Sequence, residues 1–247
     1  TSIAVTAQAA IAGSQLPAQF AGNLLSSVNA DVIGSIVART SQQITARTRP
    51  LSAAGQEAVR RALVTGASSA DNPVKVARDM VRLARAAAVD LPLRRAEAIA
   101  RTELLGAARQ ATQAWGMANS ATLQGWEWLS SRSRSTCPAC FSMDGTFHEL
   151  TESGPDGHVN CRCSRLLRTK TWRELGLELD EPAGLIRLSA EDHFRSMSRD
   201  DQLAIMGPGR LKALDDGASW SSLATEKPNA DWRRSFQVTP VRALQMA

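Results

Sequence analysis

The chain has no tyrosine and few aromatic residues of any kind. Phenylalanine and tryptophan together account for 4% of its 247 residues, whereas hydrophobic residues as a whole account for 43% and alanine is frequent. The chain therefore has enough apolar side chains for a core, but few of them are large aromatic rings. This composition favours closely packed helices over a β-sandwich. At this length the chain forms one large domain or two small ones.

Long apolar runs are absent as well. No stretch approaches the roughly 18 residues of a membrane span, and no basic segment precedes the apolar N-terminus. We therefore expect neither a transmembrane helix nor a signal peptide. The sequence begins at Thr1 instead of Met, which is expected of a fragment, a processed form or the ordered part of a longer chain.

The common catalytic motifs are also missing. The sequence contains no G-x-S-x-G, no Walker A loop, no H-E-x-x-H and no G-x-G-x-x-G. His148 and His193 are isolated in the sequence, and single histidines are more often structural than catalytic. We therefore expect that the protein is not an enzyme.

All four cysteines, in contrast, lie in one stretch together with a histidine. Cys137, Cys140, His158, Cys161 and Cys163 form the pattern C-x2-C-x17-H-x2-C-x-C. Short C-x2-C and H-x2-C pairs present two ligands from one turn, and thiolate and imidazole suit tetrahedral Zn²⁺. We expect a structural zinc site. Two disulfides are the alternative, although a chain of this length can build a core without them, and free thiols are the third reading.

Five candidate ligands compete for the four positions of such a site. Cys137 and Cys140 are the firmer half, and the choice among His158, Cys161 and Cys163 stays open. Catalytic zinc keeps one position for water, whereas a structural site is closed. An over-filled ligand set therefore favours a structural ion.

Two turn signals separate the halves of the cluster. Asp144-Gly145 between apolar-containing segments predicts a two-residue β-hairpin, and residues 154–157 (Gly-Pro-Asp-Gly) predict a second turn. Together they would bring Cys137 and Cys140 back against the second half of the cluster. Alternation over Gly125–Leu129 predicts a strand that enters the module and supplies two tryptophans to a small core beside the metal.

These residues resemble the pattern of a known phage family. Cys137-Pro-Ala-Cys140, the Asp144-Gly145 turn and the closing His158-Val-Asn-Cys-Arg-Cys163 are similar to the Mu F-like minor head proteins of tailed bacteriophages, also called phage head morphogenesis proteins. Upstream, Ile99-Ala-Arg-Thr-Glu103 resembles the Ala-Arg-Thr-Glu segment that precedes the cysteines in that family. The resemblance covers about residues 50–170 and is looser outside them.

The resemblance implies a structural virion component that links portal and capsid during head assembly, DNA packaging or delivery. Its expected partners are portal, capsid or scaffold proteins, with contact to packaged DNA. It would be made in the host cytoplasm and lie in several copies near the portal vertex. It also suggests that Arg101 and Glu103 belong to a polar network that ties their helix to the following domain. The alternatives are a zinc-stabilised nuclease of the treble-clef or His-Asn-His type, with His148 recruited, and a zinc-containing nucleic-acid-binding module.

Periodicity predicts a mainly α-helical α+β chain in four parts. These are a low-charge helical arm (1–50, with a helix over 29–48), an Ala-rich helical domain (51–122), a Cys/His β-hairpin module (123–170), and short helices with an extended tail (171–247). Three helices are expected in the second part, over 51–66 with Gly66 as the stop, 74–88 after an Asn72 cap, and 93–118. The inward positions expected for the third are Leu93, Ala96, Ala100, Leu104, Ala107, Ala111 and Trp115.

Further on, a capping box at Ser189 and Asp192 predicts a short helix. Two more short helices should break at Gly207-Pro208-Gly209, and Gly217 should end the second.

The net charge of +5, with a pI near 9.5, is compatible with proximity to nucleic acid. Two groups of cations stand out. Arginines and a lysine bracket the cysteine cluster: Arg132, Arg134, Arg165, Arg168, Lys170 and Arg173. A basic stripe at helical spacing comprises Lys75, Arg78, Arg82 and Arg85. Either group could contact phosphates or an acidic partner, or simply be solvated.

Overall fold

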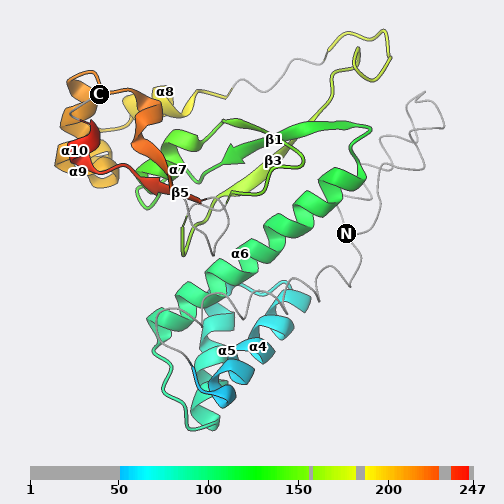
Figure 1. Cartoon of the computed structure of the whole chain (residues 1–247), viewed down its shortest axis with the longest axis vertical. Coiled ribbons are helices and arrows are strands. Elements are labelled where there is room, and N and C mark those ends of the chain that lie inside the picture. The colour runs from blue at the N-terminus through cyan, green and yellow to red at the C-terminus, as the bar shows by residue number, and fades with distance from the viewer. Residues whose placement is uncertain (1–50, 156–157, 182–186, 228–234, 245–247) are drawn as a thin grey trace.

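The computed structural model describes residues 51–155, 158–181, 187–227 and 235–244 (Figure 1). Within these ranges the chain is mainly α-helical with two small antiparallel sheets, which confirms the predicted class. The arm expected over 1–50, with its helix at 29–48, lies outside the described residues.

The first three described helices form an antiparallel group with its own core. They are α4 (Ala53–Ser68), α5 (Pro73–Ala86) and α6 (Leu93–Ala118). Ser52 and Asn72 cap α4 and α5 by accepting hydrogen bonds from backbone N–H groups of the first turn. Their buried side chains are small or aliphatic, as an aromatic-poor composition requires, and include Val59, Leu63, Met80 and Ile99.

Gly66 does not end α4, contrary to the prediction. It is buried inside the helix, and a Cβ at this position would lie 2.3 Å from Cγ2 of Val76 on α5. The glycine is therefore explained by the close approach of two helices, a long-range constraint that looks like a stop signal in the sequence.

The two halves of helix α6 pack against different parts of the structure. In its first half Ala96 and Ala100 pack against α4 and α5, as predicted, and Ile99, which was not predicted, packs with them. Leu93, predicted to face inward at the start of the helix, is 44% exposed. In its second half the predicted apolar seam is only half-buried, and the buried positions are Arg109 and Gly116. A Cβ on Gly116 would lie 3.2 Å from Leu167 of the sheet, so the second half of α6 packs against the cysteine module (Figure 1).

The module is built on a three-stranded sheet with the order β2-β1-β3. Its strands are β1 (Leu123–Leu129), β2 (Phe147–Glu149) and β3 (Ser164–Thr169). The central β1 places both Trp126 and Trp128 in a core with Cys140, Cys161 and Cys163. The predicted aromatic core beside the cluster is confirmed.

The Asp144-Gly145 turn differs from the prediction. The segment before it is a helix, α7 (Pro138–Met143), and not a strand. Asp144 has φ −62° and ψ 124°, Gly145 has φ +89°, and Thr146 N donates to Met143 O, which is a type II turn. The turn therefore joins α7 to β2. Strands β1 and β2 still pair with each other, but the connection between them contains Cys137, Cys140 and α7 and is not a two-residue hairpin.

The C-terminal part packs on the other side of α7 (Figure 1). It comprises α8 (Ala190–Ser196), α9 (Arg199–Asp215), the 3₁₀ turn η1 (Trp220–Leu223), β4 (Ala224–Lys227), β5 (Ser235–Val238) and α10 (Val241–Leu244). Ser189 caps α8 as predicted, and Gly207, at φ +71°, breaks the helical geometry of α9 as predicted.

The tail expected at the C-terminus is folded in the part that is described. Strands β4 and β5 pair antiparallel, and Leu223 and Leu244 are buried in a core with Phe141 of α7. Four-residue strands and a four-residue helix are too short to leave a periodic pattern, which is why the sequence does not reveal them.

Candidate metal centre

The first half of the cysteine cluster is the N-terminal turn of α7. Cys137 is the N-cap, Pro138 follows at the first helical position, and the Cys137 sulfur accepts a hydrogen bond from Cys140 N at 3.3 Å. Proline is favoured there because its fixed φ suits a helix start and its missing N–H is not needed. The C-x2-C spacing thus places both sulfurs on one helical turn.

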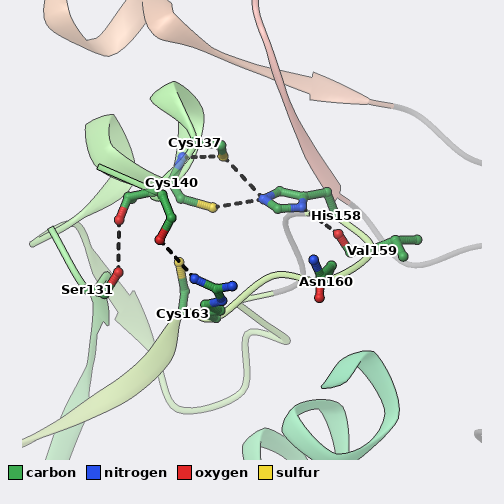
Figure 2. A pocket seen from close by; sticks show the side chains of 10 residues that line it. Ser131, Cys137, Cys140, His158, Val159, Asn160 and Cys163 are labelled. Atoms are coloured by element: carbon green, nitrogen blue, oxygen red, sulfur yellow. Dashed lines mark hydrogen bonds between the residues drawn. The ribbon is translucent and has the colours of Figure 1, made fainter. Parts of the chain in front are cut away.

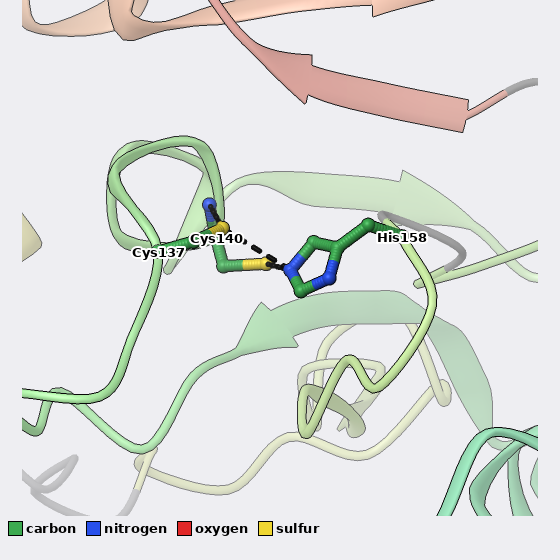
Figure 3. Close-up of side chains that lie close together, drawn as sticks. All are labelled: Cys137, Cys140 and His158. Carbon is green, nitrogen blue, oxygen red and sulfur yellow. Dashed lines mark hydrogen bonds between the residues drawn. The ribbon is translucent and has the colours of Figure 1, made fainter. Parts of the chain in front are cut away.

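The second half returns from the loop after β2 and faces the first. Nε2 of His158 lies 3.2 Å from Sγ of Cys137 and 3.4 Å from Sγ of Cys140 (Figure 3). The sulfurs of Cys140 and Cys161 are 3.8 Å apart. The predicted return of His158 and its neighbours onto the C-x2-C turn is therefore observed, and none of the four cysteines forms a disulfide.

These separations match the edges of a tetrahedral metal site. Zn–S bonds of about 2.3 Å and Zn–N bonds of about 2.0–2.1 Å place two sulfurs about 3.8 Å apart, and a sulfur and a nitrogen about 3.5 Å apart. Two groups of ligand atoms lie within 4.8 Å of one another, and both contain Cys140. One adds Cys137 and His158, and the other adds Cys161 and Cys163.

The choice of a fourth ligand rests on two observations that point to different cysteines. Cys161 makes the sulfur–sulfur contact with Cys140. Cys163, instead, lines a cavity of about 130 Å³ together with Cys137, Cys140 and His158 (Figure 2).

The pKa values of the cluster show thiols that share protons. The pKa of Cys137 falls to about 5, mainly through its hydrogen bond with Cys140 and also through His158, against the effect of burial. The pKa of Cys140 is raised by hydrogen bonds with Cys137, Cys161 and Cys163 and by burial. Because neighbouring thiolates repel, they cannot all ionise without a cation, and a metal ion supplies that charge.

The pKa values of the second half of the cluster, His158, Cys161 and Cys163, are also shifted by their neighbours. The pKa of His158 rises to about 9, mainly through its hydrogen bond with Cys137, against burial. The pKa of Cys161 is lowered by hydrogen bonds with Cys140 and Cys163, against burial, and by the charge of Arg109. For Cys163 the largest single effect, a hydrogen bond with Cys140, lowers the pKa, but Cys161 and burial together raise it to about 12.

Helix α6 holds the backbone of residues 158–163, which we call the closing hexapeptide. Nη1 of Arg101 donates to Oδ1 of Asn160 at 2.6 Å, and Asn160 N donates to Oγ1 of Thr102 at 2.9 Å. Asn160 has φ +68°, a left-handed conformation that asparagine tolerates better than most residues. The polar network expected from the Arg-Thr-Glu segment is thus observed for Arg101 and Thr102, and Glu103 is buried.

Arg109 completes this contact and was missed by the sequence analysis. Its Nε donates to the carbonyl of Cys163 at 2.8 Å and its second nitrogen, Nη2, to that of Cys161 at 2.9 Å, and the side chain is buried. The sequence did hold a sign of this contact: Arg109 lies seven residues after Thr102, which places both on the same face of the helix. The charge of a buried arginine next to thiols also favours the thiolate form.

Asp144 anchors the module to the C-terminal part. Its buried carboxylate pairs with Arg132 and with Arg187, and its Oδ1 also accepts from Ser130 N at 2.8 Å. Arg132 in turn donates to the carbonyl of Leu188 at 2.8 Å. An aspartate that reads as a turn residue in the sequence is therefore also the centre of a buried ion cluster.

The comparison with known families agrees with this geometry. The family model described as "Phage Mu protein F like protein" matches residues 54–166, from the first turn of α4 to the middle of β3. This segment is Mu F-like. No curated protein and no solved structure matches the chain.

The family that this segment matches comprises phage head morphogenesis proteins, a generally structural class. The matched range contains the helical group and the whole cysteine cluster, and it excludes α8–α10. Among the described residues, no helix combines the length and the apolar character that crossing a membrane requires.

His148, which the nuclease alternative would recruit, makes structural contacts in this Mu F-like segment. His148 stacks on Trp126 at 4.3 Å, and its two ring nitrogens contact Thr146 Oγ1 and Glu152 Oε2. In the described part of the chain, both groups of metal-ligating side chains lie in the cysteine cluster, and neither includes His148. The nuclease alternative is therefore not favoured.

Proposed function

We propose that Cys137, Cys140 and His158, with Cys161 or Cys163 as the fourth ligand, hold a structural zinc ion. The soft thiolate and imidazole donors and the matching separations support zinc over a harder cation. When bound, such an ion contributes about 10–16 kcal/mol of apparent binding energy, which is folding energy where no preformed site exists. In a module whose sheet has strands of three to seven residues, that contribution fixes the position of the closing hexapeptide.

We further propose that the protein is a minor head protein that links the portal and the capsid. The observation that carries this proposal is the division of α6. Its first half belongs to the core of α4 and α5, and its second half contacts the cysteine module through Arg109. A 26-residue helix is about 39 Å long, so it holds two separate surfaces at a fixed distance, which suits a connector between two partners.

The experiment is co-assembly of the full chain with the portal and capsid proteins of its phage. Particles assembled with and without the portal are purified by sedimentation and their protein content is compared. The proposal predicts that the chain sediments with portal-containing particles and is much reduced without the portal. Equal incorporation in both, or none in either, would contradict a portal-linking role.

A Cys137→Ser/Cys140→Ser variant connects the two proposals. We expect it to lose zinc and to be absent from the particles, because the surface beside the module is no longer held in place. As the matched control, Ser221→Ala/Ser222→Ala changes two exposed or half-buried positions away from the cluster and should be incorporated normally.

A further inference from the structure

The basic stripe predicted from the sequence is an exposed face of α5 in the structure. Four of its side chains are exposed to solvent, and we call them the α5 basic face: Lys75, Arg78, Arg82 and Arg85. They follow one another at intervals of three and four residues and span about 15 Å of helix. The opposite side of α5, with Val76, Ala77, Met80 and Ala84, is at most 1% exposed. The helix therefore cannot rotate, and its cations point outward in a fixed row.

The face keeps a positive charge after its own ion pairs are counted. Lys75 pairs with Asp71 at 2.5 Å and Arg82 with Asp79 at 2.9 Å, both on the surface. Such exposed pairs are weak and exchange readily with another anion. Arg78 and Arg85 have no carboxylate partner within the described part of the chain.

The cations around the cysteine cluster differ in this respect. Arg165 is buried, donates to the carbonyls of Gly154 and Glu152, and lies 4.3 Å above the ring of Trp126. Lys170 donates to the carbonyls of Ser120 and Ala121, and Arg168 pairs with Glu127. Arg165 and Lys170 therefore serve the fold and Arg168 is paired, whereas the α5 basic face presents four exposed cations in one row.

The chemistry of the α5 basic face favours a polyphosphate backbone over a protein. Protein interfaces rely on buried apolar or aromatic anchors, and none of the large apolar side chains of α5 is exposed. The exposed neighbours at the end of the row are small, Ala86, Ala87 and Ala88, which leaves room for a smooth cylindrical partner. Cations without anchors are what binding to phosphates without sequence preference requires.

We propose that the α5 basic face binds the backbone of duplex DNA. Binding is independent of base sequence and strongly dependent on salt, because each phosphate contact releases a counterion. The inference concerns a surface away from the metal centre, and it deepens the head-protein proposal by naming where packaged DNA would touch the chain.

The test is fluorescence anisotropy with a labelled random-sequence duplex, using the full zinc-loaded chain at several salt concentrations. The variant Arg78→Gln/Arg82→Gln/Arg85→Gln removes three charges with a residue that keeps helix propensity. The control Arg168→Gln/Arg195→Gln/Arg199→Gln removes the same charge from three other exposed arginines. Circular dichroism and zinc content verify that both variants are folded.

We expect the α5 variant to bind at least about tenfold more weakly, and its salt slope to fall by about 3. The control should stay within about threefold of the unmodified chain. Equal losses in both variants, or no binding of the unmodified chain at low salt, would overturn the proposal. So would equally effective displacement of the duplex by polyglutamate, which would assign the face to acidic polypeptides. None of these outcomes alters the co-assembly result, so this proposal and the portal-linking proposal fail separately.

Discussion

Arg109 donates a hydrogen bond from Nε to the backbone carbonyl of Cys163, 54 residues further along the chain, at 2.8 Å. The same guanidinium reaches the carbonyl of Cys161. One buried side chain of α6 therefore fixes both ends of the Cys-Arg-Cys segment, and the helix and the candidate metal centre form one structural unit.

Replacement of Arg109 should weaken both the fold and metal binding. Arg109→Ala leaves two buried carbonyls without donors, and a hydrogen bond to a charged group contributes about 1.5–3 kcal/mol. We expect a loss of about 2–4 kcal/mol in the free energy of unfolding, and a 10–100-fold loss in zinc affinity, as is typical of residues that orient metal ligands. Urea unfolding and zinc competition with a chelator measure the two effects.

Arg101→Ala is the matched comparison for Arg109→Ala. Arg101 is more exposed and contacts a side chain, Asn160, so its removal should cost about 1 kcal/mol or less. If the two variants were equally stable and bound zinc equally well, the role assigned to Arg109 would be wrong.

The fourth ligand can be identified by comparing two serine variants. The variant that removes the true ligand should lower zinc affinity by several orders of magnitude, whereas the other should lower it by about 100-fold at most, as expected for a neighbour of the ligands. Cys161→Ser and Cys163→Ser are compared by chelator competition, with cobalt absorption as a count of thiolate ligands. A large loss in both would indicate that the five-residue cluster does not reduce to a four-ligand site.

Two helical glycines should respond to alanine with opposite signs. In Gly66→Ala the new methyl group would meet Val76 of α5 at 2.3 Å, and we expect a loss of about 1–3 kcal/mol from overpacking. Among the described residues, apart from the adjoining backbone of α6 itself, no atom lies within 4 Å of the corresponding position at Gly106, so Gly106→Ala should gain about 0.5–1 kcal/mol. Thermal unfolding measures both, and the double variant Gly66→Ala/Val76→Ala should recover part of the first loss. A stabilising Gly66→Ala would show that the helices do not approach as closely as described.

Zinc affinity should still increase with pH above neutrality. In the metal-free site the pKa of His158 is raised to about 9, mainly by Cys137, so at pH 7 a proton competes with the ion. Since the ligand must be the neutral imidazole, affinity should rise about tenfold per pH unit up to pH 9, with a further contribution from Cys140, whose pKa is also raised. Chelator competition between pH 6.5 and 9.5 measures this. An affinity that is constant above pH 7 would contradict the proton balance of the cluster.

Local patterns in the sequence predicted the parts of the fold that depend on neighbouring residues. The Asn72 cap, the bounds of α6, the strand carrying Trp126 and the break at Gly207 follow from capping, periodicity and turn chemistry. The return of His158 onto Cys137 was predicted from the turn signals between the two halves of the cluster.

Contacts between distant segments were not predictable in the same way. Gly66 depends on Val76 of another helix, Arg109 on carbonyls of the closing hexapeptide, and Asp144 on Arg187 beyond the module. A buried polar or small residue looks the same in sequence as an exposed one, because its burial is decided by tertiary packing. The hairpin predicted at Asp144-Gly145 was wrong for a related reason, since the six residues of α7 before it carry too little periodicity to reveal a helix.

The proposal that Cys137, Cys140 and His158, with Cys161 or Cys163, hold a structural zinc ion is tested most directly by metal content together with thiol titration on the purified chain. We predict about one zinc per chain and at least three cysteines, the ligands, that react with a thiol reagent only slowly until a chelator removes the ion. A protein with no metal and no titratable thiols would contradict it, and would mean that the same cysteines are paired as disulfides.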